Sequence, residues 1–167
     1  KILIDNYEIN KISLSSLRER ISIVSQNTFL FNDTIKNNIL YGYPMATEKE
    51  IENATKLSGA YEFIKNLDKG FETVVGETGK KLSGGEKQKI SIARAILKDS
   101  DVIILDEATT HLDLESEKRV ENLISRNFKD KTCIIISQKI WSLPDIDRIF
   151  ILSEGKFLDK GRHDKLY

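Results

Sequence analysis

Two short apolar runs on either side of one helical pattern constrain the fold of this chain most strongly. The runs are VIIL at residues 102–105 and CIII at residues 133–136. Neither alternates between apolar and polar residues, as expected for strands covered on both faces of a parallel sheet. Between them, apolar residues recur at helical spacing: Leu114, Val120, Leu123, Ile124 and Phe128. Neighbouring parallel strands require a crossover, usually a helix, so the pattern predicts a βαβ unit and an α/β fold.

The rest of the chain divides into strand-like and helix-like parts. Apolar runs at residues 2–4, 21–24 and 149–152 are typical of strands, and a turn at Glu154 and Gly155 resembles a hairpin. Residues 27–100 instead carry helical patterns, near residues 34–41, 47–58, 60–66 and 83–98. We therefore expect a single domain, residues 1–167, with a mainly helical subdomain at 27–100. The α/β core portions would be residues 1–26 and 101–167.

Two adjacent carboxylates, Asp106 and Glu107, follow the strand at residues 102–105. They would lie at the carboxyl edge of the sheet, where open α/β sheets bind their ligands. One carboxylate there can hold Mg²⁺ beside phosphates, and its neighbour can polarise an attacking water as general base. The alternative is a solvated acidic pair that caps the next helix.

A helix start that could bind phosphate is the second candidate site. In KLSGGEKQKISIARAIL, residues 81–97, Ser83 fits an N-cap and Glu86 three residues later completes a capping box. Gly84 and Gly85 have no side chains to screen the first backbone N–H groups. The positive end of the helix dipole would therefore face an open surface and could bind an anion. The alternative is an ordinary helix start with a flexible entry.

Charge and cysteine content narrow the classes of protein. The 26 Lys and Arg residues balance the 26 Asp and Glu residues, whereas binding to nucleic acid or an acidic membrane favours a basic excess. The apolar runs are far shorter than the about 20 residues that span a bilayer, and no signal peptide opens the chain. The single cysteine, Cys133, cannot form an internal disulfide. We expect a reduced, cytoplasmic setting and no nucleic-acid partner.

In this order and spacing, the two sites resemble those of the nucleotide-binding domain of ABC transporters. LSGGEKQKISIARAIL is similar to the family signature motif, VIILDE to Walker B with its catalytic glutamate, and THLD to the D-loop. VSQNTFLF at residues 24–31 is similar to the Q-loop, while LFNDTIKNNILYG and VVGETGKKLSGG resemble the exporter branch. The resemblance covers the chain from KILIDNYEI to GKFLDKGRHDKL. It implies a partial P-loop NTPase (RecA-like) core with a mostly parallel sheet and an inserted α-helical subdomain.

The resemblance also implies a site for ATP and Mg²⁺ that two domains share. Two such domains would sandwich two ATP molecules head to tail, each site combining the Walker motifs of one domain with the signature of the other. Glu107 would be the catalytic base, with Gln26 and Asp106 at the metal. The residues implied in ATP binding are Gln26, Leu82, Ser83, Gly84, Gly85, Asp106 and Asp113.

The phosphate-binding Walker A loop is the first departure from the family pattern. It requires G-x-x-x-x-G-K-[ST], and Gly79 and Gly84 have the right separation. Gly85 and Glu86, however, stand where lysine and serine or threonine are required. Because the chain begins with Lys1 in a strand-like run, we expect a piece of a longer polypeptide with the loop upstream. Alone, this piece should bind little ATP and show no detectable ATPase activity.

The second departure is Gln138, in CIIISQK at residues 133–139, where the family usually has a switch histidine that contacts the γ-phosphate. An amide can donate a hydrogen bond to phosphate but cannot take up a proton. We therefore expect Gln138 at the catalytic position with weakened hydrolysis. Neither His111 in the D-loop-like turn nor His163 in the tail resembles a replacement.

Three functions follow from the resemblance. The first is the ATPase domain of an exporter at the cytoplasmic face of the cell membrane, with a second ABC ATPase domain and a transmembrane domain as partners. The second is a degenerate half that hydrolyses ATP slowly or not at all and supplies its signature face to an active partner. The third is a DNA-repair or chromosome-organising (SMC-type) ATPase. It is disfavoured because those proteins place a long coiled coil where a compact helical segment separates Gln26 from Ser83.

Overall fold

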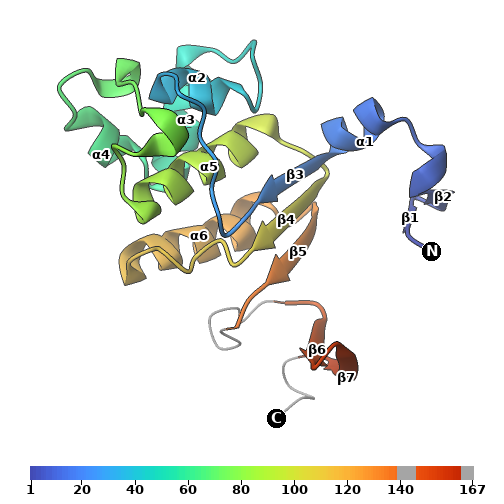
Figure 1. Cartoon of the computed structure of the whole chain (residues 1–167). Coiled ribbons are helices and arrows are strands. Elements are labelled where there is room, and N and C mark those ends of the chain that lie inside the picture. The colour runs from blue at the N-terminus through green and yellow to red at the C-terminus, as the bar shows by residue number, and fades with distance from the viewer. Residues whose placement is uncertain (139–145, 163–167) are drawn as a thin grey trace. The chain divides into compact units, whose positions relative to one another are not determined.

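The computed structural model describes residues 1–138 and 146–162 (Figure 1). The chain forms two compact units, Lys1–Ser137 and Gln138–Tyr167. Among the described residues, no helix is both long enough and apolar enough to cross a bilayer.

A three-stranded parallel sheet lies at the centre of the first unit (Figure 1). Its strands are β3 (Ile21–Val24), β4 (Val102–Asp106) and β5 (Thr132–Ile136), in the order β3-β4-β5. The helix α6 (Leu114–Asn127) connects β4 to β5, which confirms the predicted βαβ unit and the α/β fold. Because all three strands run in parallel, their carboxyl ends meet at one edge of the sheet.

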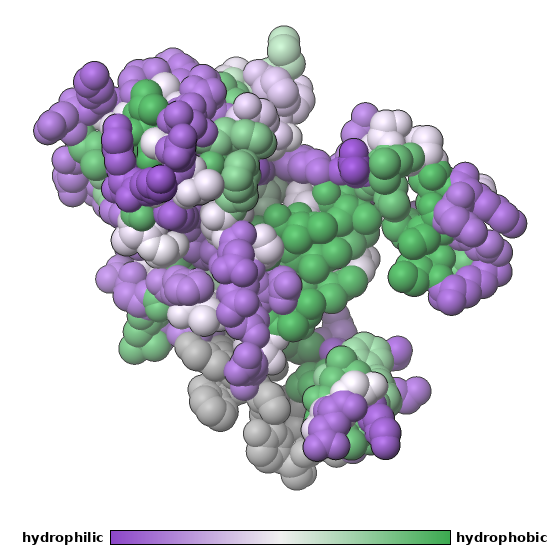
Figure 2. All heavy atoms as spheres, in the orientation of Figure 1, coloured by the Kyte–Doolittle hydropathy of each residue, from purple (hydrophilic) through white to green (hydrophobic). Residues whose placement is uncertain are grey.

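Helices cover one face of this sheet. The covered side chains of β4, Ile103 and Leu105, pack with residues of α5 (Gly84–Lys98) and α6 in a core of Val24, Ile92, Ala95, Ile103, Leu105, Ala108, Val120, Leu123 and Phe128. On the other face Ile23, Ile134 and Ile136 are 62%, 47% and 50% exposed, and Figure 2 shows an apolar area over these strands. Within Lys1–Ser137 the residues cover only one face of the sheet, so this unit does not supply the cover on both faces that the sequence predicted.

The apolar face of α6 also differs from its prediction at one end. Val120 and Leu123 are 1% and 4% exposed, whereas Leu114 is 68% exposed. Leu114 is the first residue of the helix, immediately after its N-cap Asp113, so it lies before the stripe that faces the sheet. Helical spacing alone placed it on the wrong side.

The segment between β3 and β4 is mainly helical. It contains α2 (Ile35–Leu40), α3 (Glu48–Ser58), α4 (Tyr61–Lys65) and α5, with short 3₁₀ turns η2 (Gly70–Glu72) and η3 (Glu77–Gly79). The four α-helices match the predicted helical patterns to within one residue at each end. Their core consists of Leu30, Ile35, Ile39, Ile51, Ala54, Ala60, Ile64, Val75, Leu82, Ile90 and Ala93. Since α5 supplies Ile90 to this core and Ile92 to the core under the sheet, one helix joins both parts.

The first twenty residues form small elements that the sequence predicted only in part. A hairpin of β1 (Leu3–Ile4) and β2 (Tyr7–Glu8) is followed by the 3₁₀ turn η1 (Ile9–Lys11) and by α1 (Leu14–Arg20). The helix α1 was not predicted. It has no buried residue, so its apolar spacing is too weak to indicate a helix.

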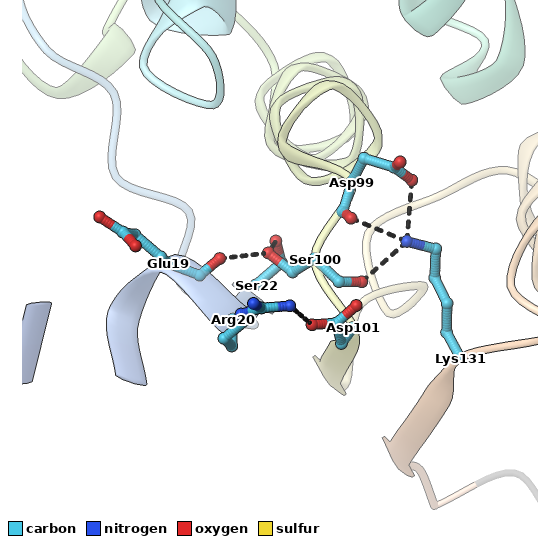
Figure 3. Close-up of polar contacts among 7 residues, drawn as sticks. All are labelled: Glu19, Arg20, Ser22, Asp99, Ser100, Asp101 and Lys131. Carbon is cyan, nitrogen blue, oxygen red and sulfur yellow. Dashed lines mark hydrogen bonds and ion pairs between the residues drawn. The ribbon is translucent and has the colours of Figure 1, made fainter. Parts of the chain in front are cut away.

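Polar contacts hold the amino-terminal ends of β3 and β4 together (Figure 3). Ser22 Oγ and Ser100 Oγ lie 2.9 Å apart in the interior, and Ser100 Oγ donates a hydrogen bond of 3.3 Å to the carbonyl of Glu19. Arg20 Nη1 donates a bond of 2.6 Å to Asp101 Oδ2 at the surface. These contacts fix the edge of the sheet opposite the carboxyl ends of the strands.

Lys131 extends this arrangement to β5 (Figure 3). Its Nζ donates hydrogen bonds to the carbonyl oxygens of Asp99 at 2.8 Å and Ser100 at 2.9 Å, and lies 2.8 Å from Asp99 Oδ1. Asp99 is the C-cap of α5, with a positive φ of 54°. The ammonium group therefore satisfies carbonyls at the end of a helix, where the dipole favours a cation.

The second unit contains an antiparallel hairpin of β6 (Ile149–Ser153) and β7 (Lys156–Gly161). Its turn is at Glu154 and Gly155, as predicted, and both residues have positive φ, at 50° and 69°. Two successive residues in this region match the twist of the flanking strands.

Candidate functional site

Gln26 and Glu107, 81 positions apart in the chain, meet at the carboxyl edge of the sheet. Gln26 lies just after β3, and Glu107 directly follows β4. Gln26 Nε2 donates a hydrogen bond of 2.6 Å to Glu107 Oε2, and Thr110 Oγ1 donates a longer bond of 3.4 Å to the same oxygen. A hydrogen bond to a carboxylate is among the stronger kinds in proteins. The structure thus joins two of the residues that the sequence singled out.

The backbone at Glu107 is held in an unusual conformation. Its φ is 47°, in the left-handed region, which costs about 1–2 kcal/mol for a residue other than glycine. Its N–H donates a bond of 2.9 Å to the carbonyl of Ile136 at the end of β5, and its carbonyl accepts one of 3.1 Å from Thr110. These bonds fix the turn in which the carboxylate lies, so its position depends on the end of β5 and on the turn after β4.

Asp106 is the last residue of β4 and pairs with Ile136 in the register of the sheet. It is partly buried and adjoins the Gln26–Glu107 pair. Within residues 1–138 and 146–162, no three His, Cys, Asp or Glu side chains form a group that could hold a metal ion by themselves. Mg²⁺ is often held by one or two protein oxygens together with phosphates and water, so Asp106 and the Gln26 carbonyl oxygen fit that ion chemically.

The start of α5 has the predicted capping box. Ser83 Oγ accepts a hydrogen bond of 3.3 Å from the Glu86 N–H, and Glu86 Oε2 accepts one of 2.7 Å from the Ser83 N–H. Ser83 and Gly84 are exposed, while Leu82 is 8% exposed and belongs to the helical core. The amino-terminal end of the helix is therefore exposed to solvent, while the preceding residue, Leu82, packs into the core of the helical part.

His111 packs against the two glycines of this helix start. A Cβ on Gly84 would meet the Cβ and Cγ atoms of His111 at 3.6 Å, which is ordinary contact. A Cβ on Gly85 would lie 2.9 Å from the backbone oxygen of His111, too close for any larger residue without a shift. Glycine at 85 is thus required by the close approach of the turn after β4. The sequence did not predict this contact because nothing local signals it.

Asp113 is the N-cap of α6. Its Oδ1 accepts a bond of 2.9 Å from the Ser116 N–H, and its Oδ2 accepts one of 2.8 Å from Ser116 Oγ. These bonds, with a smaller contribution from Lys89 Nζ at 3.6 Å, lower the pKa of Asp113 to about 2. The carboxylate therefore has a structural role here, and Lys89 connects it to α5.

Gln138 belongs to the second unit, whereas Gln26 and Glu107 belong to the first. It follows Ser137 at the end of β5. The structure therefore gives no distance between Gln138 and the carboxylates. His163 lies outside the described residues.

Three polar side chains hold the loop after β3, and none of them was predicted from the sequence. Gln88 on α5 is 1% exposed, and Asn38 on α2 is fully buried. Arg94 on α5 donates a bond of 2.8 Å to the carbonyl of Asn38 and one of 3.4 Å to that of Phe29. Burial lowers the pKa of Arg94. The only local sequence signal for a side chain that holds a loop in this way would be a polar residue among apolar residues on one face of a helix.

A family model of ABC transporters matches residues 1–110. The chain is 48% identical over 166 residues to the ATP-dependent lipid A-core flippase of Syntrophus aciditrophicus (strain SB), covering 99% of this chain and 28% of the flippase. It is 48% identical over 165 residues to ABC transporter B family member 4 of Dictyostelium discoideum, covering 99% of this chain and 22% of that protein.

Among solved structures, a bacterial Atm1-family ABC exporter with ATP bound matches with a TM-score of 0.93 and 38% sequence identity. The match covers 98% of this chain and 29% of the exporter chain. The chain therefore spans less than a third of the length of each of these three proteins.

Proposed function

Because this chain belongs to the ABC transporter family, we propose that it is the ATP-binding and ATP-hydrolysing part of an exporter that drives transport across a membrane. The observation that carries the proposal is the hydrogen bond of 2.6 Å between Gln26 and Glu107 at the carboxyl edge of a parallel sheet. Open α/β sheets bind their ligands at this edge. The relatives support the exporter assignment because they include a flippase and an ATP-bound exporter.

In this proposal Asp106 and Gln26 hold Mg²⁺, which would neutralise charge on the ATP phosphates. Glu107 accepts a proton from the attacking water as general base. In the structure Gln26 Nε2 donates a hydrogen bond to Glu107 Oε2, so the side chains proposed for the metal and for the base lie side by side. Gln138 would contact the γ-phosphate as a hydrogen-bond donor.

The signature end of α5 would bind ATP held by a second ABC ATPase domain in a head-to-tail dimer. Ser83 and Gly84 are exposed at the positive end of a helix, where backbone N–H groups favour an anion. Leu82, Gly85 and Asp113 would position this surface rather than contact ATP through their side chains.

A transmembrane domain would be the other partner, with this chain at the cytoplasmic face of the cell membrane. Large apolar side chains are exposed on the loop after β3 and beyond the end of α2: Phe29, Phe31, Tyr41, Tyr43 and Met45. The rings of Phe29, Phe31 and Tyr41 contact one another in turn. The rings of Phe31 and Tyr41 lie 4.2 Å apart. Contiguous exposed apolar side chains mark protein contact sites, and Phe29 and Phe31 lie on the same loop as Gln26. The same proposal divides the chain into two parts. The α/β core consists of residues 1–26 and 101–167, and the helical subdomain consists of residues 27–100.

One observation favours a second candidate, a degenerate half that binds ATP but turns it over slowly. Gln138 stands where the family usually has histidine, and an amide cannot take up a proton. Replacing Gln138 with histidine should then raise the rate of hydrolysis. An unchanged rate would mean that the Gln138 amide is sufficient for hydrolysis, and it would contradict this second candidate.

The experiment joins this chain to a strand–loop–helix segment of a related exporter that carries the G-x-x-x-x-G-K-[ST] loop. This loop chimera should hydrolyse Mg-ATP, whereas the chain without the segment should not. Glu107→Gln in the loop chimera should lower kcat by about 10²–10⁴-fold and keep ATP binding, because only the base is lost. The matched control is Glu48→Gln, whose side chain is 88% exposed on α3. Equal activity of the Glu107→Gln and Glu48→Gln variants would refute the assignment.

A further inference from the structure

We propose that Gln88 is a positioning residue that holds Gln26 against Glu107, so that the helix carrying the signature motif sets the geometry of the hydrolytic pair in its own domain. The inference rests on the proposed function, since Glu107 matters as a base only if ATP is hydrolysed. Gln88 lies within the signature motif, LSGGEKQKISIARAIL, but is not among the residues assigned above to ATP, Mg²⁺ or catalysis.

The loop that carries Gln26 has no strand or helix over residues 25–33. Its backbone groups therefore need partners other than a ladder. Gln88 supplies two contacts on either side of Gln26: its Nε2 donates a hydrogen bond of 3.3 Å to the carbonyl of Ser25, and its Oε1 accepts one of 2.5 Å from Thr28 Oγ1. Gln26 thus lies between two residues, Ser25 and Thr28, that both form hydrogen bonds with the Gln88 side chain.

Gln88 is suited to this role by its burial and its chemistry. It is 1% exposed and lies one turn into α5, four residues after Gly84. An amide carries a donor and an acceptor, and both are used here. An apolar side chain of similar size would leave the Ser25 carbonyl and the Thr28 hydroxyl without these partners, so the loop would have to rearrange.

The later part of the loop is held by other side chains. Arg94 Nη1 donates to the carbonyl of Phe29, and Asn38 both accepts from the Phe31 N–H at 2.9 Å and donates to the Phe31 carbonyl at 3.0 Å. Loss of Gln88 should therefore release residues 25–28 while these contacts keep residues 29–31 in place. The effect is expected at Gln26 and not throughout the helical part.

A link between two parts of the proposed site follows. Ser83 and Gly84 begin the helix that carries Gln88, and Gln88 fastens the loop that carries Gln26. A shift of this helix end, such as an anion could cause, would move Gln88 with it because both belong to one hydrogen-bonded helix. The bond between Gln26 and Glu107 would then lengthen or shorten, which couples the signature surface to the general base.

The first test uses nitrogen-15 NMR of the Gln26 side-chain amide in the full 167-residue chain. Gln26→Ala assigns the resonance by its disappearance. Gln88→Leu should move it toward the position of an exposed glutamine amide, and Gln88→Glu, which keeps the acceptor for Thr28 but loses the donor to Ser25, should move it part of the way. The control is Ser91→Ala on the same helix, where the native side chain is 7% exposed and which should leave the resonance in place.

Circular dichroism shows whether each variant folds. If Gln88→Leu fails to fold, Thr28→Val decides the question, because it removes only the hydrogen bond to Gln88 Oε1, whereas Gln88→Glu also buries a charge. An unmoved Gln26 resonance in the folded variants overturns the proposal.

The second test uses the loop chimera. Gln88→Leu should lower kcat for ATP hydrolysis by about 10- to 100-fold with KM for ATP nearly unchanged, because a displaced catalytic pair affects the chemical step. Gln88→Glu should recover part of the rate. A moved Gln26 resonance with unchanged kcat would overturn the link to catalysis. A loop chimera with no activity before any substitution would instead overturn the proposed function, while the NMR result would still decide the position of Gln26.

Discussion

The ammonium group of Lys131 joins the end of α5 to the beginnings of β4 and β5, and Lys131→Met removes this group while keeping most of the side-chain stem. The lost contacts are bonds of 2.9 Å to the Ser100 carbonyl and 2.8 Å to the Asp99 carbonyl, and an ion pair of 2.8 Å with Asp99 Oδ1. The Lys131 side chain is only 17% exposed, so water cannot readily replace these partners.

The three contacts differ in their expected contributions to the free energy of unfolding. Ser100 is 4% exposed, so its bond to a charged donor should contribute about 1.5–3 kcal/mol. The bond to the Asp99 carbonyl, in an exposed residue, should contribute about 0.5–1.5 kcal/mol. The Asp99 side chain is 80% exposed, so the ion pair adds about 0–1 kcal/mol. Because these terms are not independent, we expect a total loss of about 2–4 kcal/mol.

Urea unfolding followed by circular dichroism measures this loss, and thermal unfolding should show a Tm lower by about 5–15 °C. The matched control is Lys129→Met, two residues earlier, where the native side chain is exposed and the change should be within about 0.5 kcal/mol. Equal losses in the two variants would refute the reasoning, because they would mean that the bonds at the end of α5 contribute nothing beyond a surface lysine.

Three further predictions concern single side chains. Gly85→Ala should lower stability by about 1–3 kcal/mol, because its Cβ would lie 2.9 Å from the His111 backbone oxygen, whereas Gly84→Ala should be nearly neutral; equal Tm values would contradict this. The pKa of Asp113 is lowered to about 2, so the stabilisation from its ionised form is complete above its unfolded pKa of about 4 and is lost as pH falls through about 2. A carbon-13 NMR titration of this carboxyl with a midpoint near 4 would be inconsistent with the cap. Burial raises the pKa of Cys133 to about 11. At about pH 8 its thiol should therefore react far more slowly with a disulfide reagent in the folded chain than in urea, and similar rates would contradict the raised pKa.

The parallel sheet and its crossover could be predicted because their signals are local. VIIL at residues 102–105 and CIII at residues 133–136 are continuous apolar runs with a helical stripe between them, and each element needs only its own residues to be recognised. The start of α5 was predictable for the same reason, since Ser83 and Glu86 are three positions apart.

The contacts that organise the candidate site could not be predicted in this way. Gln88 lies 60 positions from Thr28 and 63 from Ser25, and the contact of His111 with Gly85 depends on how the turn after β4 approaches α5. No spacing rule reports such pairs, because they arise from packing between elements. Glu107 was anticipated from its place at the end of a strand and Gln26 only from the family resemblance, and the hydrogen bond between them depends on the folded loop.

The positive φ of Glu107 records a trade-off between stability and activity at one position. Glycine at 107 would relieve about 1–2 kcal/mol of backbone strain, and the N–H bond to the Ile136 carbonyl would remain. Selection for stability alone would therefore favour glycine, as it does at many left-handed positions. A glutamate persists there only if the carboxylate is worth more to the organism than the stability that it removes. Libraries of this chain selected for folding should accumulate glycine at 107, and libraries selected for ATP turnover in the loop chimera should retain the acid.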